Sequence, residues 1–360
     1  MVTLQLIALL LGAGHQVAVV TRKAKRSRLF EESVAGCAGL SCTEIEIPDG
    51  ATQALPKDDP TIQDLWASDR LVPEALSFNV AAQDFYRTHR FDWVVVSFIP
   101  DLALLQAQGR ILLNVFGLPP NEEIALRERP LLERCQAMTF ASHYTRERFR
   151  VMFSLQALDP GPVLHASVGL NFFDYRARHG KEFDCCFVGR LTSRKGVYTI
   201  LEAVDWLKWT AGRKISVAIA GDGPERQGLR TRANELGVAD QIIWLGAVGG
   251  DGVADVIDRS RCYLFPSLQP EAFGCGNIEA MSRGVPVITT NLGGTSDYVR
   301  AGENALICEP ASADSLGQAI ERVLEDPHLS TRLMRAGLAT ASDFHPSKLS
   351  PRWLKVFASV

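Results

Sequence analysis

Short apolar runs rich in β-branched residues recur along the chain and alternate with segments of helical period. We expect them to be strands, at residues 16–21, 43–47, 93–98, 111–116, 137–142, 163–168, 184–189, 215–220, 241–246, 262–266, 285–290 and 305–309. Strands that are apolar on both faces and alternate with helices are typical of parallel sheets with helices on both sides. The pattern predicts the α/β class, with two Rossmann-like domains.

The break between the two series of runs sets the expected domain limits. Polar and aromatic residues interrupt the pattern over 169–183, which predicts an N-terminal domain over 1–168 and a linker over 169–183. The second series predicts a C-terminal domain over 184–340. Helical spacing resumes after two prolines, so residues 341–360 are expected to form a helix that returns to the N-terminal domain. A chain of 360 residues is long enough for two cores.

The composition is that of a globular protein without a strong charge bias. Hydrophobic residues make up 46%, charged residues 22%, and the formal net charge is −3, which gives no reason to expect a nucleic-acid partner. The eight cysteines form no C-x-x-C pair, so free thiols and a cytoplasmic location are expected. The apolar N-terminus lacks the basic flank of a signal peptide and is too short to span a membrane.

Loops at the carboxyl ends of parallel strands are the usual place for ligands, and two of them carry candidate chemistry. The loop "GRLTSRKG" at 189–196 places Arg190 and Lys195 beside an expected helix start, which suits a diphosphate, although a solvated basic turn is the plainer alternative. The loop "GDGPE" begins with Gly221, which permits close approach of a ligand or only a tight turn.

Two glutamates flank a small-residue turn in "PSLQPEAFGCGNIEAM". Seven residues separate Glu271 from Glu279, and the glycines at 274 and 276 argue against one continuous helix. We expect Glu271 in a loop and Glu279 on the helix that follows, so that both face one cleft. Carboxylates there can accept hydrogen bonds from sugar hydroxyls. Two unrelated surface glutamates are the alternative.

Together these segments resemble the donor domain of retaining GT-B glycosyltransferases, in particular glycosyltransferase family 4. The resemblance covers residues 187 to about 326 and rests on "FVGRLTSRKGVYTILEAV", "VAIAGDGPE", "IIWLGAV", "LFPSLQPEAFGCGNIEAMSRGVPVITTNLGGTSDYV" and "GENALICEP". It implies a GT-B fold, in which two Rossmann-like domains face each other across a cleft. It also implies transfer of a sugar from a UDP-, GDP- or ADP-sugar to a hydroxyl acceptor.

The resemblance also implies roles for individual residues. Arg190 and Lys195 would hold the donor diphosphate, Glu271 the sugar hydroxyls, and Glu279 the ribose. The donor site would further include Gly189, Gly221 and the backbone amides of Phe273, Gly274 and Cys275, with Glu271, Arg190 and Lys195 as the catalytic set. Base contacts would come from the turn at 246–250. No metal or other cofactor is implied, and the sequence contains no Asp-x-Asp.

The first half departs from that family in two ways. The chain starts within what resembles the family's first helix, so the first strand and its glycine-rich loop are expected to be missing, through a truncated start or through divergence. Phe116 in "NVFGLP" stands where many relatives have a histidine. His143 and His165 follow or end expected strands on the same edge, and either could substitute, although a structural role is the more ordinary one.

The segment "TRKAKRSR" carries five cations within residues 22–28. Such a patch could attract anionic lipid, which would make the protein peripheral to a membrane, or it could be a solvated loop.

The prediction is therefore a retaining, metal-independent glycosyltransferase whose acceptor is a glycan, a lipid or a natural product. One alternative is a nucleotide-sugar-binding protein without transfer activity, suggested by the short N-terminus and Phe116. A nucleotide-sugar epimerase is a second alternative. A nicotinamide dehydrogenase is disfavoured because no G-x-G-x-x-G follows a strand.

Overall fold

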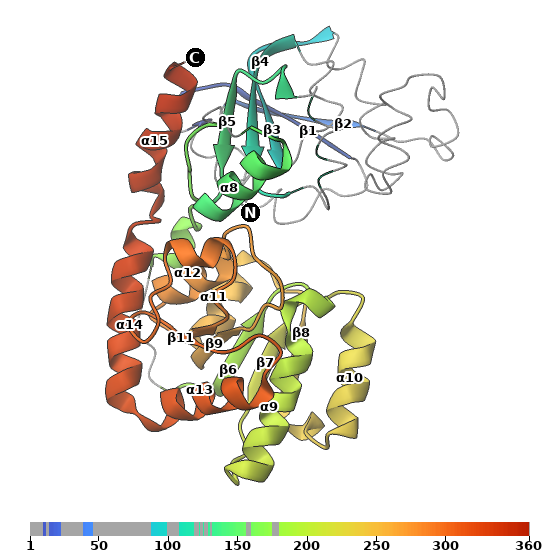
Figure 1. The fold of residues 1–360 in the computed structure, drawn as a ribbon, viewed down its shortest axis with the longest axis vertical. Coiled ribbons are helices and arrows are strands. Elements are labelled where there is room, and N and C mark those ends of the chain that lie inside the picture. Colours follow the sequence, from blue (N-terminus) through green and yellow to red (C-terminus); the bar gives the residue numbers. More distant parts are fainter. Residues whose placement is uncertain are drawn as a thin grey trace, which may run out of the picture. The chain divides into compact units, whose positions relative to one another are not determined.

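The structure is a computed structural model that describes most of the second half of the chain and parts of the first. The described residues are 10–11, 14–22, 39–45, 88–98, 108–118, 122, 125, 129, 132–155, 160–174 and 180–359. Residues 23–28 of the basic cluster lie outside them. The chain divides into one compact unit of residues 1–165 and 350–360 and a second of residues 166–349 (Figure 1). The finer domain limits drawn from the sequence stay predictions.

The first unit contains two parallel sheets in its described part. Strand β1 (Val17–Arg22) pairs with β2 (Leu40–Ile45), and β4 (Gln108–Val115) lies between β3 (Arg90–Phe98) and β5 (Ala137–Phe140). The five residues Ile111 to Val115 are all buried, as a strand covered on both faces requires. Helix α8 (His143–Met152) packs Phe149 against Phe140 of β5.

The expected strand at 163–168 is wrong beyond its first residues. Only Val163 forms a β-bridge, with Phe140, although Leu164 still donates its amide to the Phe140 carbonyl at 2.9 Å. The reason lies in the neighbouring strand. Strand β5 ends at Phe140, and Ser142 then caps α8, so residues after Leu164 have no extended partner beside them.

The second unit contains a six-stranded parallel sheet. Its strands are β6 (Phe183–Val188), β7 (Val217–Ala220), β8 (Ile242–Gly246), β9 (Ser260–Phe265), β10 (Val287–Thr289) and β11 (Leu306–Ile307). They lie in the order β8-β7-β6-β9-β10-β11, which is the order 3-2-1-4-5-6 of a Rossmann fold. The α/β class with parallel sheets is confirmed.

Helices cover both faces of this sheet (Figure 1). They are α9 (Val197–Thr210), α10 (Arg226–Glu235), α11 (Gly250–Asp258), α12 (Cys275–Ser282), α13 (Ala313–Glu325) and α14 (Pro327–Ser342). One apolar core joins Phe187 and Ile219 of the sheet to Ile200 of α9 and Ile320 of α13. Successive residues of a strand face opposite sides, so Tyr263 points away from this core, toward Gly276 of α12.

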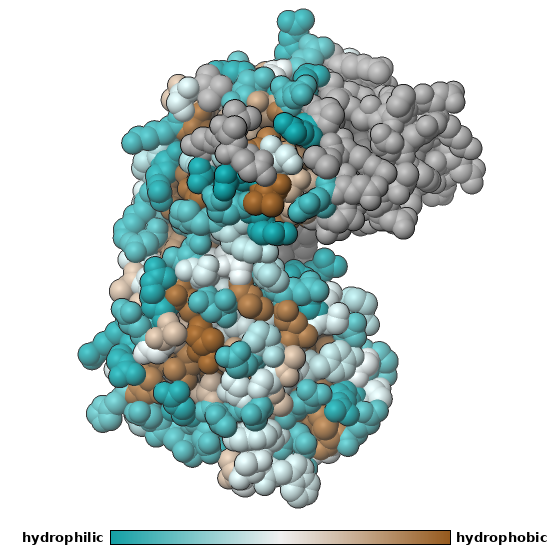
Figure 2. All heavy atoms as spheres, in the orientation of Figure 1, coloured by the Kyte–Doolittle hydropathy of each residue, from teal (hydrophilic) through white to brown (hydrophobic). Residues whose placement is uncertain are grey.

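The last helix, α15 (Pro346–Ala358), continues past the end of the second unit at Leu349. Its later residues belong to the first unit, where the Phe357 and Trp93 rings meet edge to face with centroids 5.4 Å apart. Hydrophilic residues cover much of the molecular face drawn in Figure 2. Among the described residues no helix has both the length and the apolar character that a membrane span requires.

Candidate functional site

The strand order of the second unit reverses between β6 and β9, which are neighbours in the sheet but far apart in the sequence. From β6 the chain continues to β7 and β8 at one edge of the sheet, and from β9 it continues to β10 and β11 at the other edge. In Rossmann folds ligands bind at this point, beyond the carboxyl ends of the strands. The loop after β6 carries Lys195, and the loop after β9 carries Glu271.

The loop after β6 is folded tightly against the loop after β9. Residues Ser193–Lys195 form a 3₁₀ turn that ends at Gly196, whose φ of 69° lies in the left-handed region. A Cβ at Gly196 would lie 1.9 Å from the Pro266 carbonyl oxygen, so only glycine permits this approach. The Leu268 amide donates to the Arg194 carbonyl at 2.8 Å, which joins the two loops through their backbones.

This contact brings Lys195 and Glu271 together. Nζ of Lys195 lies 2.7 Å from Oε1 of Glu271, and only 14% and 9% of the two side chains is exposed. The same oxygen accepts a hydrogen bond from Oγ of Ser267 at 2.5 Å and faces NH1 of Arg194 at 3.5 Å. Burial lowers the pKa of Lys195, and the Glu271 charge opposes that shift. The loops at the point where the strand order reverses therefore carry a largely buried ion pair between Lys195 and Glu271.

The backbone of Glu271 is held from the other side by the loop after β10. Its amide donates to the Leu292 carbonyl at 3.2 Å, and its carbonyl accepts from the Gly294 amide at 2.7 Å. Gly293 lies between these two residues at a φ of 71°, and a Cβ there would meet the Glu271 backbone. The "LGG" turn thus fixes the position of Glu271.

Helix α12 begins directly after the loop that carries Glu271, between β9 and β10. Gly274 caps its start in the left-handed conformation, without any side-chain hydrogen bond to the first turn. Uncapped amides at a helix N-terminus favour an anion. The Phe273 ring is buried between Tyr298 and Phe344, at centroid distances of 5.2 and 5.3 Å, so only the backbone of Phe273 could serve a ligand.

Glu279 lies on α12, with its side chain turned into the unit. It is 6% exposed, and burial raises the pKa of its carboxyl to about 7. Its carboxylate has no hydrogen-bond partner among the described residues. Burial, followed by the charges of Glu279 and Glu271, raises the pKa of the Cys275 thiol to about 12. The charges of both glutamates therefore influence the Cys275 thiol at the start of α12. Their roles toward a donor stay predictions.

Gly189 and Gly221 begin the loops after β6 and β7, and their backbones touch. A Cβ at Gly221 would lie 1.8 Å from the Gly189 carbonyl oxygen, and φ of Gly221 is 145°. The glycine at 221 is therefore needed for packing between the two loops. Whether either glycine also contacts a donor stays a prediction.

Arg190 is not among the cations that pair with Glu271. Its side chain is exposed and makes no ion pair with any described residue, so it is available to a ligand. Arg194 and Ser267 are in the cluster, and the sequence reasoning missed both. The signal for Arg194 was its place next to Lys195, and the signal for Ser267 was its place at the end of the apolar run before Glu271.

A further ion pair supports α12. Arg283 follows the helix, pairs with the buried carboxylate of Asp258, and donates to the carbonyls of Asn171 and Asp174 at 3.1 and 2.8 Å. Arg283 is 7% exposed and Asp258 4%. The pair ties the start of the second unit to the end of α12 and was not expected from the sequence.

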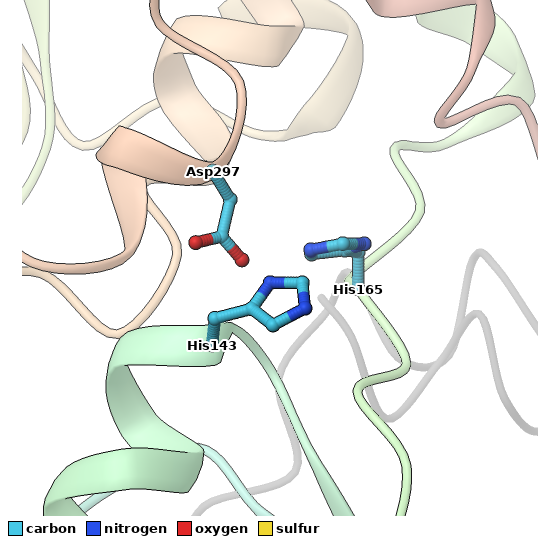
Figure 3. Close-up of side chains that lie close together, drawn as sticks. All are labelled: His143, His165 and Asp297. Atoms are coloured by element: carbon cyan, nitrogen blue, oxygen red, sulfur yellow. The ribbon is translucent and has the colours of Figure 1, made fainter.

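In the first unit the structure brings two histidines together. The rings of His143 and His165 lie with their centroids 6.0 Å apart, tilted by 55° (Figure 3). His143 begins α8 after β5, and Phe116 follows β4, the neighbouring strand. The histidines and Phe116 thus lie at the carboxyl edge of one sheet. Their part in catalysis stays a prediction.

Comparison with known proteins finds relatives of this chain. Residues 171–339 match the family model of glycosyl transferases group 1. The chain is 32% identical over 157 residues to the 2-deoxystreptamine glucosyltransferase of Streptomyces kanamyceticus, covering 44% of this chain and 40% of that protein. It is 28% identical over 261 residues to a GDP-mannose-dependent phosphatidylinositol monomannoside mannosyltransferase of Mycobacterium tuberculosis, covering 65% and 66%. The matches thus span less than two thirds of these relatives.

Solved structures resemble nearly the whole chain. Sucrose-phosphate synthase from Thermosynechococcus elongatus superposes with a TM-score of 0.76 at 18% identity, covering 98% of this chain and 92% of that one. Anabaena HepE, solved with UDP and glucose, superposes with a TM-score of 0.76 at 14% identity, covering 100% and 96%. This likeness supports the GT-B fold. Residues 171–339, almost the whole of the second unit, are thus similar to the glycosyl transferases group 1 family.

Proposed function

We propose that this protein transfers a sugar from a nucleotide-diphospho-sugar to a hydroxyl acceptor, with retention of the anomeric configuration. The observation that carries the proposal is the Lys195–Glu271 pair at the switch point of the second unit, at 2.7 Å. It places a cation for phosphate beside a carboxylate for sugar hydroxyls.

The charges of the site suit a donor diphosphate. Arg194 and Lys195 lie beside Glu271, and Arg190 is an exposed cation in the same loop as Lys195. The start of α12, which no side chain caps, adds backbone donors for the same anion.

The proposed reaction breaks the bond between the anomeric carbon and the diphosphate oxygen. Negative charge then develops on the leaving group, and Arg190 and Lys195 stabilise it. The acceptor oxygen attacks the same face of the sugar and forms the new bond. Its proton passes to the leaving phosphate oxygen, so that the configuration is retained and the nucleoside diphosphate is released.

The names of the relatives support a nucleotide-sugar donor and leave a choice of acceptors. HepE binds UDP-glucose, and the mannosyltransferase depends on GDP-mannose. The same group includes a lipopolysaccharide core glycosyltransferase of Rhizobium meliloti. We propose UDP, GDP or ADP as the donor nucleotide, and a hydroxyl of a glycan, a lipid or a natural product as the acceptor.

The proposal includes a place of action in the cytoplasm, at a membrane surface. Sγ of Cys185 and Sγ of Cys262 lie 3.3 Å apart as free thiols, which suits a reducing compartment. The five cations of residues 22–28 would provide the membrane contact. Unchanged binding to anionic vesicles after replacement of these cations by alanine would contradict that part.

The test is a thermal-shift panel with UDP-, GDP- and ADP-sugars and their free nucleotides, followed by transfer assays. A ligand that binds only the folded protein stabilises it by about 2.7 kcal/mol at a hundredfold excess over Kd. We expect one nucleotide family to shift the melting temperature, and the shift to disappear in Lys195→Ala. Activity retained in EDTA would support metal independence, and the anomeric coupling of the product in NMR would decide retention. A panel without any shift would overturn the proposal.

A further inference from the structure

The Glu271 carboxylate is anchored through one oxygen only. Ser267, Lys195 and Arg194 all meet Oε1, at 2.5, 2.7 and 3.5 Å. The other oxygen, Oε2, accepts no hydrogen bond from any residue that the structure describes. One oxygen of the carboxylate, Oε1, is therefore hydrogen-bonded within the described part of the protein, and Oε2 is left to accept a hydrogen bond from a ligand.

The three donors differ in what else they can do. Lys195 carries three N–H groups and Arg194 is 44% exposed at its side chain, so both can turn toward a phosphate and still lie near Glu271. Ser267 is 2% exposed, and its hydroxyl has one proton, which it donates to Oε1. The Ser267 bond is thus the contact with Glu271 that a bound diphosphate would compete for least.

The position of Ser267 is itself fixed by the sheet. It follows the last residue of β9 by two positions, and its carbonyl accepts a hydrogen bond from the Thr290 hydroxyl at 2.7 Å. Thr290 in turn donates its amide to Phe265 at 3.3 Å. The backbone of Ser267 is therefore tied to Thr290 just beyond the ends of two neighbouring parallel strands, so the position of its side chain is fixed by the sheet.

From this geometry we propose that Ser267 is a positioning residue, which holds Glu271 by Oε1 so that Oε2 faces a hydroxyl group of the donor sugar. The inference rests on the proposed function and deepens it. The terminal torsion of a glutamate is soft, and without the Ser267 bond the carboxylate can rotate. A fixed Oε2 would accept a charge-assisted hydrogen bond, whose strength depends on its direction.

The test compares a nucleotide sugar with its free nucleotide in Ser267→Ala. The probes are UDP with UDP-glucose, GDP with GDP-mannose and ADP with ADP-glucose, titrated calorimetrically into the full chain, and the pair that the wild type binds is used for the variants. We expect Ser267→Ala to weaken the nucleotide sugar about tenfold and to leave the free nucleotide within about twofold. Ser267→Thr keeps the hydroxyl and should retain the ratio of the wild type.

Ser260→Ala is the matched control. Ser260 is also buried on β9 and donates one hydrogen bond, to the Val256 carbonyl at 2.8 Å, but it lies at the other end of the strand. It should leave both affinities unchanged. Deoxy analogues of the donor sugar provide the second readout, because the loss in Ser267→Ala should vanish for the one analogue that lacks the hydroxyl read by Oε2.

The possible failures are distinguishable. If the wild type binds neither nucleotide nor nucleotide sugar, the proposed function is overturned, and the inference with it. If the wild type binds both and Ser267→Ala weakens both equally, or weakens every deoxy analogue equally, only the inference is overturned.

Discussion

Nζ of Lys195 lies 2.7 Å from Oε1 of Glu271, although 76 positions separate the two residues in the sequence. They come together because β6 and β9 are paired in the sheet and because Gly196 lies directly against Pro266. The pair joins a group that suits phosphate to a group that suits sugar. We therefore expect that loss of either residue of the pair reduces both donor binding and the rate of sugar transfer.

Lys195→Ala should abolish transfer and leave the fold intact. The loss of one donor to a developing negative charge typically costs about a hundredfold or more in turnover. The melting temperature should change little, because Ser267 and Arg194 remain beside Glu271. Steady-state kinetics and circular dichroism measure the two effects. Near-wild-type turnover in Lys195→Ala would show that Lys195 is not part of the catalytic site.

Glu271→Ala and Glu271→Gln should differ in stability but agree in activity. The alanine variant leaves the Lys195 charge partly buried without its partner, which should cost about 3 kcal/mol of unfolding free energy. The glutamine keeps the shape and one acceptor, and should cost less. Both should reduce transfer about a hundredfold, since neither presents a carboxylate to the sugar. Urea denaturation and initial rates would check this, and full activity in the glutamine variant would contradict it.

Glu279 predicts a pH dependence of stability. Burial raises the pKa of its carboxyl in the folded state to about 7, above the ordinary value of 4.5. The folded protein therefore holds a proton that the unfolded chain has released, and its contribution is fully present below pH 4.5 and lost as the pH rises through 7.

Relative to the wild type, Glu279→Gln should therefore gain stability between pH 4.5 and 7.5, by an amount on the order of 3 kcal/mol. Chemical denaturation at a series of pH values measures the gap between the two proteins. A gap that stays constant over this range would show that Glu279 does not titrate there.

Gly196→Ala should destabilise the second unit more than Gly212→Ala. Both glycines have positive φ, at 69° and 62°, so both substitutions carry the conformational penalty of about 1 kcal/mol. A Cβ at Gly212 meets nothing within 4 Å, whereas one at Gly196 would lie 1.9 Å from the Pro266 carbonyl oxygen. We expect an additional cost of about 2 kcal/mol or more at Gly196. Donor affinity should also fall in Gly196→Ala only, and equal effects would contradict the loop contact.

Most strands could be predicted from apolar runs, because a strand buried on both faces is apolar at most of its positions. The run at 163–168 was an exception, since most of its residues are apolar but the neighbouring strand ends at Phe140. Whether a segment forms a strand depends on whether an extended strand lies beside it, and the amino-acid sequence of the segment alone does not show that. Turn glycines such as Gly196, Gly274 and Gly293 could be recognised more easily, because a backbone with positive φ favours glycine whatever lies beside it.

The chain's own residue order was sufficient to predict the parallel α/β class, the loop position of Glu271 and the helical position of Glu279. Local propensity and the spacing of glycines settle such features within a few residues. Strand order and packing decided two features that the sequence did not reveal. Three side chains meet one oxygen of Glu271, those of Ser267, Arg194 and Lys195. The side chain of Arg190 is exposed. Distances of a few ångströms between residues far apart in the sequence depend on the burial of the whole sheet, and no local pattern encodes them.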